Sequence, residues 1–581
     1  MIKTVDFQKY FVLRMTEMMH KDTLDSYRVR TNNALSIIIE LKNVLQGWLD
    51  GNVKRFSTVD YCIQECLDLI NNDDCLAFSN YDKNLFLANL TDYTKRAKSG
   101  KDLPLFHETN FILYAVEDLI QTNKTLYFEN LVSKIKNYVI ANIEYGGDDQ
   151  FSVILRQFDD LLAAFGCELL RKGYSKKYLF SFFNAMKKNP QHQDFGDAFN
   201  KMVTDLTVQT GRQFSVVIKL SFDNNKNAIT AEQKINNIYV SVPQKIQEQI
   251  VVQKSYERSN SQTRYFVLDK VEALDSASAA RKGYEDLSEM LDYNQDVVKS
   301  VKIPSRALVV AHDSHVERKE STENFYILDA GGKYADEPKE SLQSTLKRTH
   351  DSRIVQEDVK DRIESALRHL RIGDSQIEIE QQFINYWIAL EFIFSSSDRN
   401  SSTFERIKIY LVQILSVCYI KRNTEYLKNW FMKTHYIAQE DHLYDVLNNE
   451  EADDGMLSIL GRFRAKNMKS HLHSKENIND YIKVHKRHLI QHIVRIYRLR
   501  NELVHEAAIK QDIMNVTSNL RFYLIFVLNQ LIGFSVEESS KINEVSMERF
   551  FWFYAKWEKL IMSEDAKEGA LQVPIAKNYV Q

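Results

Sequence analysis

Hydrophobic positions along the first 208 residues recur at a helical spacing. Between Leu35 and Leu49 the apolar residues form a stripe with a period of about 3.6 residues, and Gly51 follows where a helix commonly ends. Similar stripes predict further helices, at 111–122, 126–143, 151–172 and 175–188. This pattern predicts an N-terminal helical domain over residues 1–208.

The pattern changes between residues 209 and 330. Five segments rich in β-branched and aromatic residues predict strands, at 214–222, 238–242, 264–268, 306–310 and 324–328. The segment from Ser276 to Leu291 predicts a helix between the third and fourth strands. We therefore expect a small α+β module with a mostly antiparallel or mixed sheet. After the fourth strand, His312, Asp313 and His315 are expected in an exposed loop rather than a metal cluster.

Residues 331–354 are polar, have few apolar anchors and predict a linker. The helical period then returns, with stripes at 358–370, 377–394 and 403–418. These stripes predict a second helical domain over residues 355–565 and a C-terminal tail over 566–581. The fold class expected from the whole chain is mainly α.

Composition narrows the class of protein further. The 581 residues suffice for three or four domains of about 150 residues each, and 6 prolines and 17 glycines favour long helices over turn-rich β structure. An odd number of cysteines without a Cys-x-x-Cys pair predicts a reduced, cytoplasmic protein without disulfides or zinc. The most apolar stretch, 522–534, is too short to span a bilayer, so we expect no membrane association.

A strongly basic run extends from Arg462 to Arg500. Its lysines and arginines far outnumber the acidic residues, Glu476 and Asp480, although the whole chain has a formal net charge of −3. Such a local excess is typical of a polyphosphate-binding surface, because phosphate contacts supply most non-specific affinity. We predict RNA contacts from five of these residues, Lys483, Lys486, Arg487, Arg495 and Arg498. A solvated helix face or a site for an acidic protein partner is the alternative.

The basic run ends in the hexapeptide from Arg500 through Asn501 to His505. A guanidinium carries permanent positive charge and an imidazole can move a proton near neutral pH, a combination suited to phosphodiester chemistry. In a continuous helix, positions five apart diverge by about 140°. Arg500 and His505 could therefore meet on one phosphate only if the helix ends or kinks between them, or if a second copy of the chain supplies one group. The alternative is a terminal arginine and a histidine that caps the last carbonyls.

This hexapeptide resembles the signature of the HEPN superfamily, in which a histidine follows an arginine by four to six positions. Upstream, three segments resemble the opening helices of its Apea-like branch: Ile363–Leu367, Leu370–Gly373 and Phe383–Glu391. The resemblance covers about residues 355 to 540 and implies a C-terminal HEPN-like helical bundle. It leaves the N-terminal helical part uncovered and matches the α+β module only loosely, as a possible sensor or regulatory region.

The resemblance implies a metal-independent endoribonuclease that needs no cofactor and acts at a homodimeric site. Arg500 would stabilise charge on the phosphate, His505 would be general acid or base, Asn501 would donate a hydrogen bond to phosphate, and Glu391 would orient Arg500 or His505. The RNA 2′-hydroxyl would attack its own phosphate. The resemblance also implies a toxin-like effector of antiphage defence, a homodimer or higher homo-oligomer, with a phage-derived trigger.

Two other interpretations stay open from the sequence. A non-catalytic HEPN-like scaffold would use the basic helix to dock RNA or a protein, and Glu391 would then belong to a solvated face or a structural ion pair. A DNA-binding regulator that uses the same helix is the more distant alternative.

Overall fold

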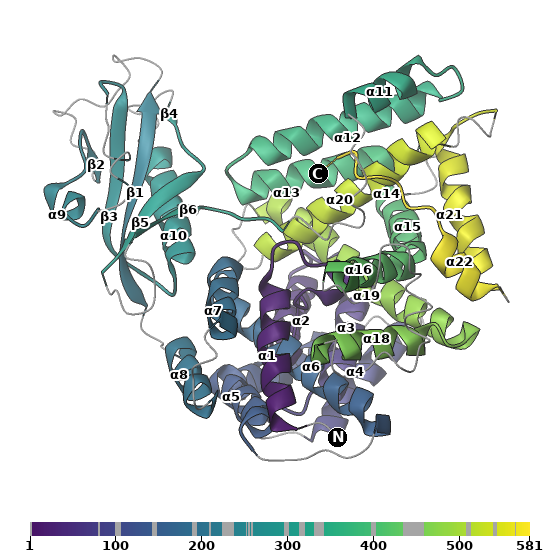
Figure 1. The fold of residues 1–581 in the computed structure, drawn as a ribbon, viewed down its shortest axis with the longest axis horizontal. Coiled ribbons are helices and arrows are strands. Elements are labelled where there is room, and N and C mark those ends of the chain that lie inside the picture. Colours follow the sequence, from purple (N-terminus) through teal and green to yellow (C-terminus); the bar gives the residue numbers. More distant parts are fainter. Residues whose placement is uncertain are drawn as a thin grey trace. The chain divides into compact units, whose positions relative to one another are not determined.

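The computed structural model describes most of the chain, namely residues 3–78, 82–98, 106–141, 148–188, 195–207, 211–222, 237–250, 253, 256, 260–294, 301–312, 320–329, 342–396, 402–433, 458–506, 513–537, 543–563 and 565–580. The described fold is mainly α with one small antiparallel sheet (Figure 1). It divides into two compact units. The helical unit contains Met1–Glu168 and Leu328–Gln581, and the sheet unit contains Leu169–Ile327.

The first part of the helical unit follows the predicted stripes. Its helices are α1 (Thr4–Met19), α2 (Ala34–Leu49), α3 (Phe56–Asn71), α4 (Lys83–Lys98), α5 (Phe106–Val139) and α6 (Asp148–Arg171), with a 3₁₀ turn at Asp25–Tyr27. Helix α2 confirms the stripe predicted over 35–49. It starts in a reciprocal cap, in which the Ser36 N–H donates to Asn33 Oδ1 and the Asn33 N–H donates to Ser36 Oγ, each at 2.8 Å.

The second part of the helical unit contains α11 (Leu342–Asp351), α12 (Glu357–Ser375), α13 (Ile379–Phe394), α14 (Thr403–Arg406), a π-helical turn (Ile407–Leu411), α15 (Val412–Val417), α16 (Tyr419–Lys433), α18 (Ile459–His471), α19 (Lys475–Glu506), α20 (Ile513–Glu537), α21 (Met547–Ile561) and α22 (Ala566–Gln572). Helix α20 is apolar and long enough to cross a membrane. However, 78% of its most apolar window is buried within the structure, so it is a core helix.

The division into units differs from the predicted domains. The helical domains predicted over 1–208 and 355–565 share one unit, and residues 169–208 belong with the sheet. Helix α11 occupies part of the predicted linker, where it buries Thr345 and Thr349; residues 331–341 lie outside the described residues. The separation predicted between the two helical parts is absent because apolar stripes from both ends of the chain pack in one core.

The predicted C-terminal tail is also part of that core. Val573, Tyr579 and Val580 are buried. The Asn529 side chain of α20 accepts from the Val580 N–H at 2.8 Å and donates to the Val580 carbonyl at 3.0 Å. This segment is therefore packed against the core helix instead of forming a free tail.

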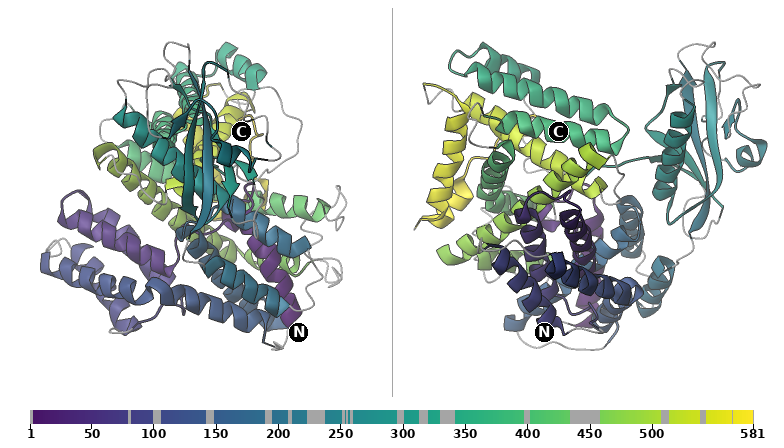
Figure 2. Two further views of the ribbon diagram at one scale, coloured as in Figure 1. Left: turned by 90° about the vertical axis from the view of Figure 1, so that its left-hand side faces the viewer. Right: turned by 180° about the vertical axis from the view of Figure 1, so that it is seen from behind.

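The sheet unit contains α7 (Lys176–Lys188), α8 (Phe195–Thr207), α9 (Gln244–Gln247), α10 (Ser276–Tyr293) and strands β1 (Arg212–Phe222), β2 (Ile238–Tyr239), β3 (Thr263–Ala273), β4 (Val301–Lys302), β5 (Arg306–Ala311) and β6 (Glu320–Asn324). The strand order is β2-β3-β1-β5-β6, with β4 also paired to β1, and each of these pairings is antiparallel. Figure 2 shows this sheet from two further directions.

Three of the predicted strands and the helix predicted at 276–291 are confirmed by β1, β3, β5 and α10. The strand predicted at 324–328 is wrong, because pairing with β5 involves Glu320–Asn324 instead. The apolar residues that prompted that prediction pack against α10, where the ring of Phe325 stacks on Tyr284 with centroids 4.6 Å apart. Strand β2 is shorter than predicted.

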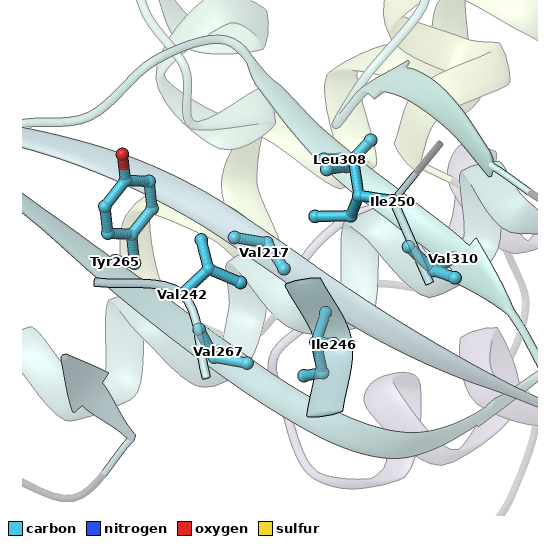
Figure 3. Packing of buried hydrophobic residues seen from close by; sticks show 8 residues of the cluster. All are labelled: Val217, Val242, Ile246, Ile250, Tyr265, Val267, Leu308 and Val310. Atoms are coloured by element: carbon cyan, nitrogen blue, oxygen red, sulfur yellow. The ribbon is translucent and has the colours of Figure 1, made fainter. Parts of the chain in front are cut away.

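Alternate residues of the central strand β1 serve two cores. Val217 belongs to a cluster with Tyr265, Val267, Leu308 and Val310 of the sheet and with Val242, Ile246 and Ile250 of the α9 region (Figure 3). Val216 points to the opposite face, as strand geometry requires, and contacts α10 at Gly283. Burial on both faces explains the nearly continuous apolar sequence of this strand.

Replacing Gly283 by alanine is expected to destabilise the sheet unit by about 1–3 kcal/mol, the usual cost of overpacking. The new Cβ would lie 2.6 Å from Val216 Cγ1, and Val216 is fully buried in the central strand, so α10 would have to shift. Urea unfolding followed by circular dichroism measures the effect. Glu289→Ala, at an exposed position of the same helix, is the control, with a change within about 0.5 kcal/mol. A Gly283→Ala protein as stable as wild type contradicts this packing.

Candidate active site at the end of helix α19

An aromatic contact sets the position of α19 against α13 and α14. The ring of Tyr497 stacks on Phe404 with centroids 3.9 Å apart and lies 5.8 Å from the ring of the buried Trp387. Arg500 comes about one turn after Tyr497, and Glu391 about one turn after Trp387, so the two residues lie on facing surfaces. The distance between Arg500 Nη2 and Glu391 Oε1 is 4.0 Å.

The guanidinium of Arg500 is held but remains accessible. Its Nη1 donates to Asn501 Oδ1 at 3.3 Å, and the side chains of Arg500 and Glu391 are 30% and 34% exposed. An ion pair this open to water contributes only about 0–1 kcal/mol. A contact this weak leaves the guanidinium able to bind a further anion, while Asn501 and the neighbouring carboxylate of Glu391 bias its orientation.

His505 occupies the last turn of α19, and its side chain lies outside the described residues. The helix is continuous from Lys475 to Glu506, so it does not end between Arg500 and His505. The two backbone positions diverge by about 140° around the axis and by about 7.5 Å along it. The helix therefore does not bring the two groups together by ending between them. A second copy of the chain could still supply one of the two groups.

Two of the predicted RNA-binding residues are turned inward. Arg495 Nε donates to both carboxylate oxygens of Glu40 at 2.9 and 3.0 Å and its Nη2 pairs with Glu65. Arg498 pairs with Glu40 and lies 3.5 Å from a carboxylate oxygen of Glu502. RNA binding by Arg495 and Arg498 was therefore a wrong prediction, because these buried arginines neutralise carboxylates of α2 and α3.

The electrostatics of this buried cluster are strong. Burial alone would raise the pKa of Glu40, but the neighbouring charges of Arg495 and Arg498 outweigh it and lower the pKa to about 2. The apolar pattern contained no signal for this partner. At about 100° per residue, Glu40 lies on the side of α2 opposite the stripe that predicted the helix, where a charged residue is expected to face solvent.

The other three predicted RNA-binding residues differ in accessibility. Lys486 is half-buried and pairs with Glu558 of α21, so its charge is already compensated. Arg487 is half exposed, with Nε 3.2 Å from an oxygen of Asp68, and Lys483 is exposed beside Asp480. A phosphate contact stays a prediction for Lys483 and Arg487.

Three histidines of the basic run do not add positive charge to the surface. Burial lowers the pKa of His485 and His492 to about 3 and that of His471 to about 4, whereas His473 and His488 are exposed. His485 stacks on Tyr419, His471 stacks on Tyr481, and a ring nitrogen of His492 lies 2.8 Å from the Tyr523 hydroxyl. These rings are neutral packing elements of the α18–α19 region near pH 7.

Within the described residues, no group of three or more His, Cys, Asp and Glu side chains is arranged to hold a metal ion. His312 contacts Ser215 Oγ at 2.8 Å and Asp269 Oδ1 at 3.1 Å, whereas Asp313 and His315 lie outside the described residues. No family model, curated protein or solved structure matches the chain. A functional proposal therefore depends on the site around Arg500 and on the resemblance of its motifs.

Proposed function

We propose that this protein is a metal-independent endoribonuclease with a catalytic set of Arg500, Asn501, His505 and Glu391. The observation that supports it most is the partly exposed contact between Arg500 and Glu391 at the end of α19. It presents an oriented guanidinium to solvent without committing it to a buried partner. The backbone positions of Arg500 and His505 diverge along the continuous helix α19, and we therefore propose that the complete site forms between the α19 helices of two copies, related by a two-fold axis.

In this proposal the RNA supplies its own nucleophile. The 2′-hydroxyl oxygen bonds to the adjacent phosphorus while the bond from phosphorus to the 5′-oxygen breaks, which leaves a 2′,3′-cyclic phosphate and a 5′-hydroxyl. Arg500 stabilises the charge on the phosphoryl oxygens, and Asn501 donates a hydrogen bond to them. His505 transfers the proton as general acid or base, and Glu391 keeps Arg500 in position. DNA lacks the nucleophile and resists cleavage.

The resemblance also supports a biological setting for this activity. We propose a cytoplasmic, toxin-like effector of antiphage defence that cleaves RNA when a phage-derived trigger releases it. The sheet unit, which the resemblance compares loosely with a sensor region, is the part we propose to receive that trigger.

Arg500→Ala and His505→Ala are each expected to lower the rate of RNA cleavage by about 10²–10⁴-fold, the usual contribution of charge stabilisation or proton transfer. The assay uses end-labelled single-stranded RNA in the presence of EDTA, with end-group analysis for the cyclic phosphate. Lys559→Ala, at an exposed position of α21, is the matched control and retains full activity. A wild-type protein inactive on RNA, or a His505→Ala protein as active as wild type, would overturn the proposal.

A non-catalytic helical scaffold is the second candidate. It is favoured by the inward pairing of Arg495, Arg498 and Lys486, which gives much of the basic run a structural role. In that case RNA or a protein partner binds without cleavage and His505→Ala leaves binding unchanged. If the protein is instead a DNA-binding regulator, duplex DNA is expected to compete for binding to the protein at least as well as RNA.

A further inference from the structure

An exposed aromatic ring lies immediately beside the Arg500–Glu391 contact. Phe392 follows Glu391 on α13 and is 41% exposed, although Leu390 and Ile393 on either side are buried. The ring of His369 from α12 stacks on it, with centroids 5.4 Å apart and planes inclined by 25°. A ring that is supported from one side and open to water on the other is a surface for a further planar group.

The His369 ring is itself held in place. Its Nδ1 lies 3.2 Å from Asn385 Oδ1, and the Asn385 amide donates to the Gln381 carbonyl at 2.8 Å. His369 thus bridges Asn385 and Phe392, which stand two turns apart on α13. We call these residues, with the half-buried Ile388 between them, the stacking strip.

Helix geometry makes the stacking strip continuous with the candidate active site. With about 100° per residue, Ile388, Phe392 and Asn385 lie about 60°, 100° and 120° around the α13 axis from Glu391, all in the same direction. Moving around α13 from Arg500, one therefore meets Glu391, then Ile388, then the rings of Phe392 and His369.

The charged residues around the strip are of both signs. Arg500 Nη2 lies 4.0 Å from Glu391 Oε1 at one side, Arg362 Nη1 donates to the Phe392 carbonyl at 2.7 Å, and Arg368, next to His369 in the sequence, is exposed. Asp361 and Glu364 of α12 are exposed as well. Arg500 is the cation whose ion pair beside Glu391 is open to water, and it is therefore the group that can bind a phosphate next to the rings.

We propose that the stacking strip is a nucleobase subsite for single-stranded RNA, with Arg500 holding a phosphate of the same strand. This inference rests on the proposed function and adds the class of substrate. Aromatic rings stack on any base, because every base has a π-face, whereas a paired base offers no free face. The enzyme should therefore prefer unpaired RNA and read little sequence at this position.

Binding of a fluorescent 2′-O-methyl oligonucleotide tests the inference, since this probe lacks the attacking hydroxyl and stays intact. Phe392→Ala is expected to weaken its binding roughly tenfold to a hundredfold, from the usual effect of losing one stacked base. Phe392→Tyr keeps a ring and restores binding. Trp552→Ala removes a ring that is 63% exposed on α21 and leaves binding unchanged. With an abasic probe of the same length, Phe392→Ala has no effect.

The outcomes separate this inference from the proposed function. Unchanged affinity in both Phe392→Ala and His369→Ala overturns the subsite, yet the nuclease proposal stands if wild type cleaves RNA and Arg500→Ala does not. Equal losses with the normal and the abasic probe also overturn it, because stacking is then not the cause. Binding that depends on Phe392 without any cleavage by wild type supports the strip and refutes the nuclease. A wild type that neither binds nor cleaves refutes both.

Discussion

Replacing Glu40 by glutamine is expected to destabilise the helical unit by about 3–5 kcal/mol, the usual cost of removing one partner of a buried ion pair. Glutamine keeps the size of the side chain, so no cavity contributes. The loss arises because Arg498 would keep only the longer contact with Glu502, at 3.5 Å, and Arg495 only its contact with Glu65. Both guanidinium groups would then be undercompensated in a buried site.

Urea or thermal unfolding monitored by circular dichroism measures this effect. The matched control is Asp480→Asn, which breaks an exposed ion pair with Lys483 within α19. It is expected to change the free energy of unfolding by no more than about 0.5 kcal/mol. If Glu40→Gln and Asp480→Asn unfold at the same midpoint, the buried cluster does not hold α2 to α19.

The stability of the helical unit is expected to fall steeply as the pH drops below about 6.5, the ordinary pKa of histidine. Burial lowers the pKa of His471 to about 4 and that of His485 and His492 to about 3 in the folded state. Between the unfolded and folded values, unfolding takes up protons at all three rings. Three protons correspond to a slope of about 4 kcal/mol per pH unit.

The direction follows from the lowered pKa values. At a pH well above 6.5 these rings are neutral in both states and contribute no pH dependence. Below pH 6.5 the unfolded chain binds protons that the folded chain does not bind. Stability is therefore lost until the pH reaches the pKa values of these histidines in the folded state. Glu40 extends the loss of stability to lower pH. Its pKa is about 2 in the folded state and about 4.3 in the unfolded chain. The stability that the ionised carboxylate contributes is therefore lost as the pH falls through this range.

Unfolding midpoints in urea between pH 7.5 and 5 provide the test. His485→Phe, which preserves the stack on Tyr419, is expected to reduce the slope near pH 5 by about one proton, or about 1.4 kcal/mol per pH unit. A stability that stays constant between pH 7.5 and 5 would show that these rings are hydrated in the folded protein.

Local patterns predicted elements well and partners poorly. The apolar stripe at 35–49 and the β-branched segment around Val217 each fix a period, and a period alone determines the type of element. Whether the stripes of the two helical parts share one core depends on packing between distant segments. The sequence therefore predicted α2 and β1 but placed a linker where α11 packs and a tail where Val580 binds Asn529.

The candidate site shows the same limit. The sequence identified Glu391 as a residue that could orient Arg500, and the structure places their side chains 4.0 Å apart. It also counted Arg495 and Arg498 as surface charges, because a basic run gives the number of cations without their orientation. Residues a few positions apart on one helix can face either the core or the solvent. Arg495 and Arg498 face the core because they pair with Glu40 of α2, and the sequence of α19 alone does not show that contact.

The cluster of Glu40, Arg495 and Arg498 joins residues 455 or more positions apart in the chain. At the usual synthesis rate of about 5–20 residues per second, Arg495 leaves the ribosome roughly 20–90 s after Glu40. During that interval α2 and α3 are made without the counterions that allow their carboxylates to be buried. The N-terminal helices of the nascent chain thus complete their packing only near the end of translation.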